Sequence, residues 1–441
     1  ITEEELQAAR EAASQQQQGS KACEPRTLYA PPSGTVSEMD FVREHLVNAH
    51  GWRAVQDAEV AAFVLASGDA PPLKHPCADG FEGTRIPGTF ERELEVCQKH
   101  KLFERLADHH RIGDSGPGAL ATQWPWLPKT YLLDRAGHVA ALNAMLPCSG
   151  PQESMIVKGD AHGGRAVWLP ATNEELRALV GLPCPSQASA QPGQELDHPP
   201  RLVQEVISSI LWDGASVMGR VFFVVQRRGR TRLNPQRGRW SLGLPAPSYE
   251  LQMFDTPLFT QYFGHVRDRA DEETVGRRNY SEFEAFVQAE SARRGHRLPG
   301  NWVRAHFMDQ AGAIAAESFA ASVAPWAWEL PSSIHQRDAS DAVKAAILEP
   351  DGAFLFIAAE LLVDRDFQVR LIEFTCVPGD IHGLRDHFQT LPWTHTFAKD
   401  LGVQLARLLL QNSGQDAGSA AESGEAGRWT KVAERGPFPH P

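Results

Sequence analysis

The chain has 441 residues, of which 42% are hydrophobic and 22% charged, and these are values of a globular protein. Its net charge of −12 argues against a general nucleic-acid binder and against docking on an anionic membrane. No apolar run approaches the ~20 residues of a membrane span, and the six cysteines include no CxxC pair and are too few for a disulfide scaffold of this length. A reducing, cytoplasmic compartment is therefore the default expectation.

The N-terminal third divides into a tail and an α/β unit. Residues 1–35 combine a glutamine run with three prolines between positions 24 and 35, which predicts a flexible tail and linker. The chain begins at Ile1 rather than Met, which indicates a fragment or a processed protein. Residues 36–146 alternate between helical and strand periodicity and predict an N-terminal α/β subdomain. Its expected elements are a helix from 39 to 50, a strand at 59–66, a helix at 90–107 and a strand at 130–134.

Residues 147–230 predict a central subdomain with two basic features. An apolar strand ends in Lys158 and is followed by a loop that contains Gly163 and Gly164. Backbone N–H groups of a glycine turn can hold an anion, and a lysine adds charge for a phosphate. A plain β-hairpin with a surface lysine explains the same residues. Arg220 opens a buried strand, where it needs either a bound anion or an acidic partner in the core.

Gln204 and Glu205 lie between apolar residues of a strand predicted at 201–207. A glutamine amide on such a strand can read an adenine edge through its donor and acceptor. Ordinary strand polarity is the alternative reading. The chain holds neither a GxxxxGK[ST] phosphate loop nor a GxGxxG dinucleotide fingerprint.

Residues 231–412 predict a C-terminal subdomain, and residues 413–441 a mostly disordered tail on which Trp429 and Phe438 can still dock. Six arginines lie between Arg227 and Arg239, and they fit either an acidic partner or a solvated hairpin tip. Helical spacing appears at 280–294, 341–348 and 397–411.

The stretch from 354 to 378 predicts two strands that carry acids. The first strand is apolar except for Glu360, and the second carries Glu373 and Thr375. A two-residue loop at Arg365 and Asp366 would put all three on one face, with the two acids as diagonal neighbours. Two such carboxylates can share Mg²⁺. A core strand whose glutamate pairs with an arginine is the alternative, and a three-residue loop would separate the acids.

The order of these features is that of an ATP-grasp site, and the chain resembles the tubulin–tyrosine ligase-like family as a divergent member. The resemblance is collinear over about residues 80–410. It is carried by Met155–Lys158 (MIVK), Val203–Ile207 (VQEVI), Val217–Arg220 (VMGR), Leu258–Tyr262 (LFTQY), Ile86-Pro87-Gly88, and the thirteen-residue spacing from Glu360 to Glu373.

The resemblance implies an α+β ATP-grasp fold in which two α+β layers clamp a nucleotide. It implies ATP and Mg²⁺ as cofactors, an amino acid and tubulin or another acidic protein tail as substrates, and a cytoplasmic, cytoskeletal or ciliary location. Its implied site comprises Arg220, Glu360 and Glu373 in catalysis, Lys158, Gly163, Gly164, Gln204, Glu205 and Ile207 around ATP, and Glu360, Glu373 and Thr375 around the metal.

Several positions depart from the family pattern. Met218 stands where the family has an Asp, Thr375 replaces a metal-ligand Asn, Glu205 replaces a common basic residue and Gln261 replaces an Asn. Two functions remain open on this basis. One is an ATP-dependent carboxylate–amine ligase, and the other is a degenerate ligase fold that acts as a scaffold or binding subunit.

Overall fold

The computed structural model describes fifteen segments of the chain. They are 24–29, 38–56, 61–64, 96, 99–109, 124–152, 154–159, 166–182, 184, 199–228, 248–262, 276–322, 354–376, 391–412 and 428–435. Among these residues no helix is both long and apolar enough to cross a membrane.

The largest sheet of the described residues has eight strands and forms the centre of the molecule. Its main path runs β12-β11-β9-β10-β15, and β13 pairs with β9 and β14, while β8 pairs with β9. The strands are β8 (Leu211–Trp212), β9 (Ala215–Arg228), β10 (Ser248–Phe254), β11 (Leu258–Tyr262), β12 (Gly276–Arg278), β13 (Phe354–Val363), β14 (Val369–Cys376) and β15 (Trp429–Arg435).

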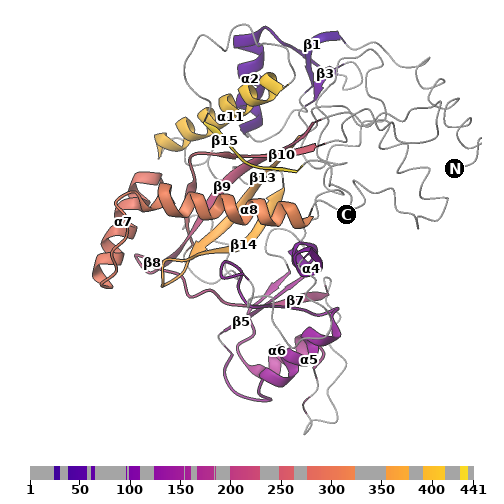
Figure 1. The fold of residues 1–441 in the computed structure, drawn as a ribbon, viewed down its shortest axis with the longest axis vertical. Helices are drawn as coiled ribbons and strands as arrows, with labels where there is room; N and C mark the ends of the chain where they lie inside the picture. The colour runs from indigo at the N-terminus through magenta and orange to yellow at the C-terminus, as the bar shows by residue number, and fades with distance from the viewer. Residues whose placement is uncertain are drawn as a thin grey trace, which may run out of the picture.

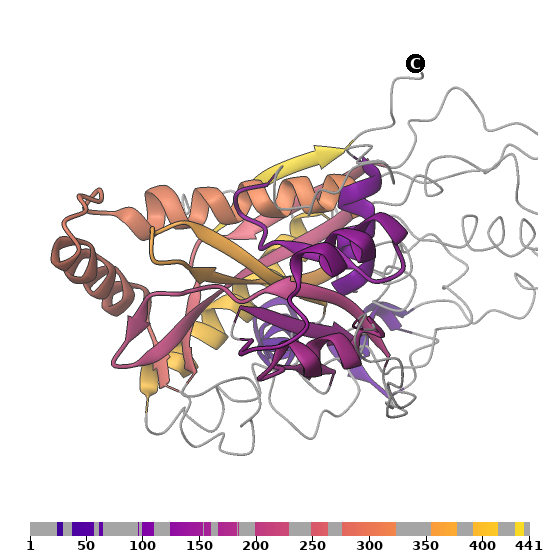
Figure 2. The ribbon, with the colours of Figure 1, turned by 90° about the horizontal axis from the view of Figure 1, so that it is seen from below.

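Helices cover both faces of this sheet (Figures 1 and 2). One face is packed against α7 (Tyr280–Arg293) and α8 (Met308–Ser322), which follows a π-helical turn, η4 (Val303–Phe307). The other face is packed against α11 (Pro392–Asn412) and α2 (Glu38–His50). Apolar side chains on both faces of β9 explain why this strand is hydrophobic throughout most of its length.

A small parallel sheet lies beside α2. Its order is β2-β1-β3, with β1 at Glu24–Tyr29, β2 at Arg53–Val55 and β3 at Ala61–Val64. Parallel strands around a helix agree with the α/β layer predicted for the N-terminal part. The prediction of a linker at residues 24–35 is wrong for 24–29, because Thr27 and Leu28 of β1 are buried at the centre of this sheet.

A third sheet of four antiparallel strands lies at the opposite end of the molecule from α2 (Figure 1). Its order is β4-β7-β5-β6, and its strands are β4 (Thr130–Leu132), β5 (Met155–Gly159), β6 (Val167–Trp168) and β7 (Pro200–Glu205). One of its faces packs against α5 (Ala136–Met145) and α6 (Asn173–Leu179). The other carries Leu132 and Leu202, which share a core with α4 (Lys99–His109).

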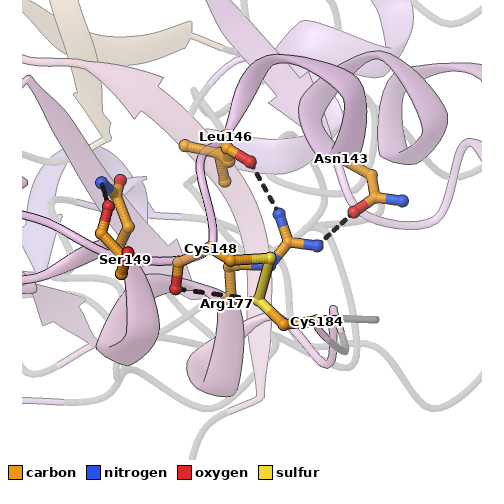
Figure 3. Close-up of a disulfide and its surroundings, with 7 residues drawn as sticks. Asn143, Leu146, Cys148, Ser149, Arg177 and Cys184 are labelled. Carbon is orange, nitrogen blue, oxygen red and sulfur yellow. Dashed lines mark hydrogen bonds between the residues drawn. A yellow bond between two sulfur atoms is a disulfide. The ribbon is translucent and has the colours of Figure 1, made fainter. Parts of the chain in front are cut away.

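A disulfide joins Cys148, between α5 and β5, to Cys184, just after α6 (Figure 3). The Cα atoms are 5.7 Å apart and the residues are separated by 36 positions. Arg177 of α6 donates to the carbonyl oxygen of Leu146 at 2.9 Å and to the amide oxygen of Asn143, so polar contacts reinforce the same junction. The segment that contains Lys158 is thus closed into a covalent loop.

The sheets group the chain differently from the predicted subdomain boundaries. β4 belongs to the predicted 36–146 unit but pairs with β7, and β8 and β9 belong to the predicted 147–230 unit but join the largest sheet. Part of the predicted C-terminal tail, 429–435, forms β15 and pairs with β10. The predicted helix at 341–348 and the arginines after 228 lie outside the described residues.

Candidate functional site

The alternation of side chains along β9 and β13 produces a charged pair next to a core. Phe222 and Phe356 stack at 5.7 Å between ring centroids and are buried in the core beneath α11. Arg220 and Glu360 lie on the same faces of their strands, further along, and are register partners. Arg220 Nη2 is 2.5 Å from Glu360 Oε1, and the side chains are only 7% and 10% exposed. The acidic partner expected for a buried arginine is therefore Glu360.

The β13–β14 hairpin places the second acid directly opposite the first, because Glu360 and Glu373 are register partners. The loop holds three residues after Asp364 rather than the predicted two, and its last residue, Phe367, takes φ +59°. Asp364 Oδ1 holds this turn by accepting two backbone N–H groups. Ile372 is then an extra residue in β14, where the register shifts. The longer loop alone would put the two acids on opposite faces, and the bulge restores a common face. The predicted common face is therefore confirmed, but the predicted diagonal arrangement is wrong, because the two acids lie directly opposite each other.

Both acids have further partners. Thr375 Oγ1 donates to Glu360 Oε1 at 3.1 Å, which confirms that Thr375 shares the face. Glu373 Oε2 is 2.7 Å from the Nζ atom of Lys99, the first residue of α4. The sequence did not reveal Lys99, because a lysine at the start of an amphipathic helix is common and its partner lies far along the chain.

Lys158 completes the cluster from the four-stranded sheet. It is 6% exposed, and its Nζ donates to Gln204 Oε1 at 2.7 Å. Burial lowers the pKa of Lys158 to about 8, while the charges of Glu373 and Glu360 act in the raising direction and that of Lys99 in the lowering direction. Lys158 therefore lies within electrostatic reach of both acids, and the structure brings together the lysine, arginine and two glutamates singled out in the sequence.

The residues predicted to contact adenine have other contacts. Gln204 is 2% exposed, and its Nε2 donates to Thr130 Oγ1 at 2.9 Å, so its amide is used within the sheet. Glu205 is half-buried and its Oε2 accepts from the backbone N–H of Lys129 at 3.4 Å. Ile207 is half-buried in the connection from β7 to β8. Gly163 and Gly164 lie outside the described residues.

Two of the four positions that depart from the family pattern, Met218 and Gln261, are buried in the core. Met218 is 5% exposed and pairs in register with Thr260 and Leu362. Gln261 is fully buried; its Nε2 donates to the carbonyl oxygen of Trp212, and its Oε1 accepts from Arg278 Nε at 2.9 Å. Neither side chain adds a carboxylate to the charged cluster.

The donor atoms of the cluster match the chemistry of Mg²⁺, which prefers carboxylate and other oxygen ligands. Two opposed carboxylates and the Thr375 hydroxyl supply such oxygens. Each carboxylate is also paired with a protein cation, so a metal ion would share or replace these contacts. In the described part of the chain, no group of three His, Cys, Asp or Glu residues has a metal-holding arrangement.

Comparison with known proteins finds a likeness in fold. No protein-family model matches the chain, and no curated protein sequence matches it. Among solved structures it is similar to the C-terminal domain of K. lactis Pby1, described as an ATP-grasp enzyme that interacts with the mRNA decapping enzyme Dcp2. The TM-score is 0.50 and the identity 12%, over 92% of this chain and 98% of that domain. At this identity the likeness shows the fold alone, which is the expected α+β ATP-grasp architecture.

Proposed function

We propose that this chain binds ATP at the charged cluster between its four-stranded and eight-stranded sheets. The observation that carries the proposal is the convergence of Lys158 from one sheet with Arg220, Glu360 and Glu373 from the other. A buried, desolvated lysine attracts phosphate oxygens strongly, because little water competes for the charge. The ATP-grasp fold supports the same ligand.

As a ligase, the chain would join a carboxylate to an amine. The γ-phosphoryl group of ATP would move to a substrate carboxylate oxygen, which gives an acyl phosphate and ADP. The amine would then attack the carbonyl carbon, phosphate would leave, and the amine nitrogen would lose a proton. Lys158 and Arg220 would orient the phosphates and offset the charge that develops on them.

Glu360, Glu373 and Thr375 would hold Mg²⁺, which when bound would supply positive charge near the phosphates. The resemblance to tubulin–tyrosine ligase-like proteins supports an amino acid as one substrate and an acidic protein tail, such as that of tubulin, as the other. It also supports a cytoplasmic site of action, at the cytoskeleton or a cilium. The Cys148–Cys184 disulfide departs from the reducing compartment expected from the sequence, because disulfides are typical of oxidising compartments.

A second candidate function is a binding or scaffold subunit without turnover. Met218 brings no carboxylate, and the Thr375 hydroxyl is already used on Glu360. Both glutamates are neutralised by protein cations. These features favour a cluster that binds a ligand or stabilises the fold but does not catalyse a reaction. The function of the chain would then be to bind another protein.

A thermal-shift titration with ATP and Mg²⁺ tests the proposed site. ATP at about 100 times its Kd stabilises a folded protein by about 3 kcal/mol. We expect a shift for the wild type and for Lys129→Ala, an exposed lysine, and none for Lys158→Ala. An equal rise in melting temperature for Lys158→Ala would show that Lys158 does not contact ATP. If ATP does not raise the melting temperature of the wild type, ATP binding is refuted.

Release of ADP separates the two candidate functions. Purified protein with ATP, candidate acidic tails and amino acids should release ADP only when an acceptor is present if it is a ligase. If ATP binds and no acceptor mixture produces ADP, while Glu373→Gln leaves partner binding unchanged, the scaffold function is favoured.

A further inference from the structure

Lys99 is a cation that belongs to the charged cluster but comes from neither sheet. It begins α4, and its Nζ lies 2.7 Å from Glu373 Oε2. The Lys99 side chain is 11% exposed and that of Glu373 is 20% exposed, so the pair is largely removed from water. Such a pair is held more firmly than one on the surface, because solvent screens it less.

The ion pairs divide the charges of the cluster in a simple way. Arg220 neutralises Glu360, and Lys99 neutralises Glu373. The Nζ atom of Lys158 instead donates to the neutral amide of Gln204, and the two carboxylates act on it through space. Three cations against two carboxylates give this group of five side chains a net charge of +1. Within this group of five side chains, the excess of positive charge favours an anion before any metal ion is added.

We propose that the Lys99 ammonium occupies, at Glu373, the place of a divalent cation, so that the site holds the phosphates of a nucleotide without a metal at that carboxylate. This rests on the proposed binding of ATP at the cluster, but it removes Glu373 from the metal ligands proposed above and leaves Glu360 and Thr375 as the oxygen donors. An ammonium group and a metal ion compete for the same carboxylate oxygen. The lysine has the advantage because α4 holds it next to Glu373, whereas the metal ion must bind from solution. Lys99 would thus lower the affinity of Glu373 for metals and keep the phosphate site cationic.

The first arm of the test is calorimetric titration of ATP in EDTA and in excess MgCl₂. The variants are Lys99→Met and, as a matched control on the same helix, Lys101→Met, whose lysine pairs with Glu104 at 2.6 Å. We expect wild type and Lys101→Met to bind ATP in EDTA within about fivefold of their affinity in MgCl₂. Lys99→Met should lose at least about tenfold in EDTA, as expected for one lost charge at a partly buried site, and recover in MgCl₂.

The second arm measures Mn²⁺ binding in the absence of nucleotide, by the electron paramagnetic resonance signal of the free ion. We expect Lys99→Met to bind Mn²⁺ at least about tenfold more tightly than wild type, because Glu373 has lost its counter-charge. Glu373→Gln added to Lys99→Met should abolish that gain. Lys99→Gln keeps a hydrogen-bond donor toward Glu373 without the charge, and it gives the same comparison if Lys99→Met fails to fold.

The outcomes separate the two proposals. Equal Mn²⁺ affinity in wild type and the uncharged variant, including no binding by either, overturns the role of Lys99. The role of Lys99 is also overturned if wild type and Lys99→Met lose the same ATP affinity when MgCl₂ is replaced by EDTA. If no protein binds ATP under any condition, the proposed function fails, and the Mn²⁺ comparison alone decides whether Lys99 stands in for a metal ion.

Discussion

The buried ammonium of Lys158 should make the stability of the ligand-free protein rise with pH in a predictable window. Burial lowers its pKa from 10.5 to about 8. Each pKa unit corresponds to about 1.4 kcal/mol. The buried, charged ammonium therefore lowers the free energy of unfolding by about 3 kcal/mol at pH values below both pKa values. Between these two pKa values the unfolded chain binds more protons than the folded one, so stability increases with pH.

The substitution Lys158→Met isolates this effect, because it replaces the lysine by an apolar side chain of similar length that does not titrate. From pH 7 to about 9.5, the unfolding free energy of wild type should rise by about 2 kcal/mol relative to that of Lys158→Met. The variant also leaves the Gln204 amide oxygen without its donor, which costs about 1–3 kcal/mol. That cost is independent of pH and changes only the offset between the two curves.

Urea unfolding followed by tryptophan fluorescence, in EDTA and without nucleotide, measures the difference at each pH, provided that the urea dependence is the same in both proteins. Lys129→Met, which alters an exposed lysine, should track wild type. A difference between wild type and Lys158→Met that stays flat, or that falls as pH rises, would refute the assignment of a desolvated ammonium at this position.

Three further substitutions test the residues that support the site, and the stability of each variant is measured by urea or thermal unfolding. Arg220→Leu should destabilise the fold by about 3–5 kcal/mol because Glu360 is left buried and charged, and Glu360→Leu in the same chain should recover most of the loss; an additive double variant would contradict the pairing. Serine at both Cys148 and Cys184 should cost about 3–4 kcal/mol for a loop of this length, and a reductant should affect wild type alone. Gly219→Ala should cost about 1–3 kcal/mol, because its Cβ would overlap a buried aromatic ring; an unchanged midpoint would show that the ring moves freely.

The sequence could predict that certain side chains need partners, and for Glu360 the structure shows the alternative reading, a core glutamate that pairs with an arginine. A glutamate in an apolar strand and an arginine at the start of another need partners, and the structure pairs Glu360 with Arg220. The alternation of β13 and β14 likewise placed Glu373 and Thr375 on the correct face. The strength of the prediction came from the energetic cost of burying charge, which leaves few acceptable arrangements.

The details that the sequence did not reveal depend on one-residue choices or on long-range contacts. The loop after Asp364 and the bulge at Ile372 each add one residue, and their two shifts cancel, which a side-chain pattern cannot distinguish from no shift at all. Lys99 lies 274 positions before its partner Glu373 in the sequence. The pairing of Cys148 with Cys184 is one of several that six cysteines allow.

The weakest sequence signals belonged to strands that are completed by distant parts of the chain. β1 is a short, proline-containing segment in a polar neighbourhood, and it is stabilised by the strands on both of its sides rather than by its own periodicity. β15 follows a long stretch rich in glycine, alanine and serine, and only its pairing with β10 makes it a strand. In both cases tertiary contacts override local composition.

The position of β15 has a practical consequence for any shortened version of the protein. If the chain were cut after α11, the outer side of β10 would display a row of unpaired backbone N–H and C=O groups, which template the addition of strands from other molecules. β15 covers that row, and Lys431 of β15 lies 3.6 Å from Glu250 of β10, so an ion pair adds to the strand pairing. β15 thus protects the edge of β10, and material truncated after α11 should form soluble aggregates visible by light scattering while the full-length chain stays dispersed.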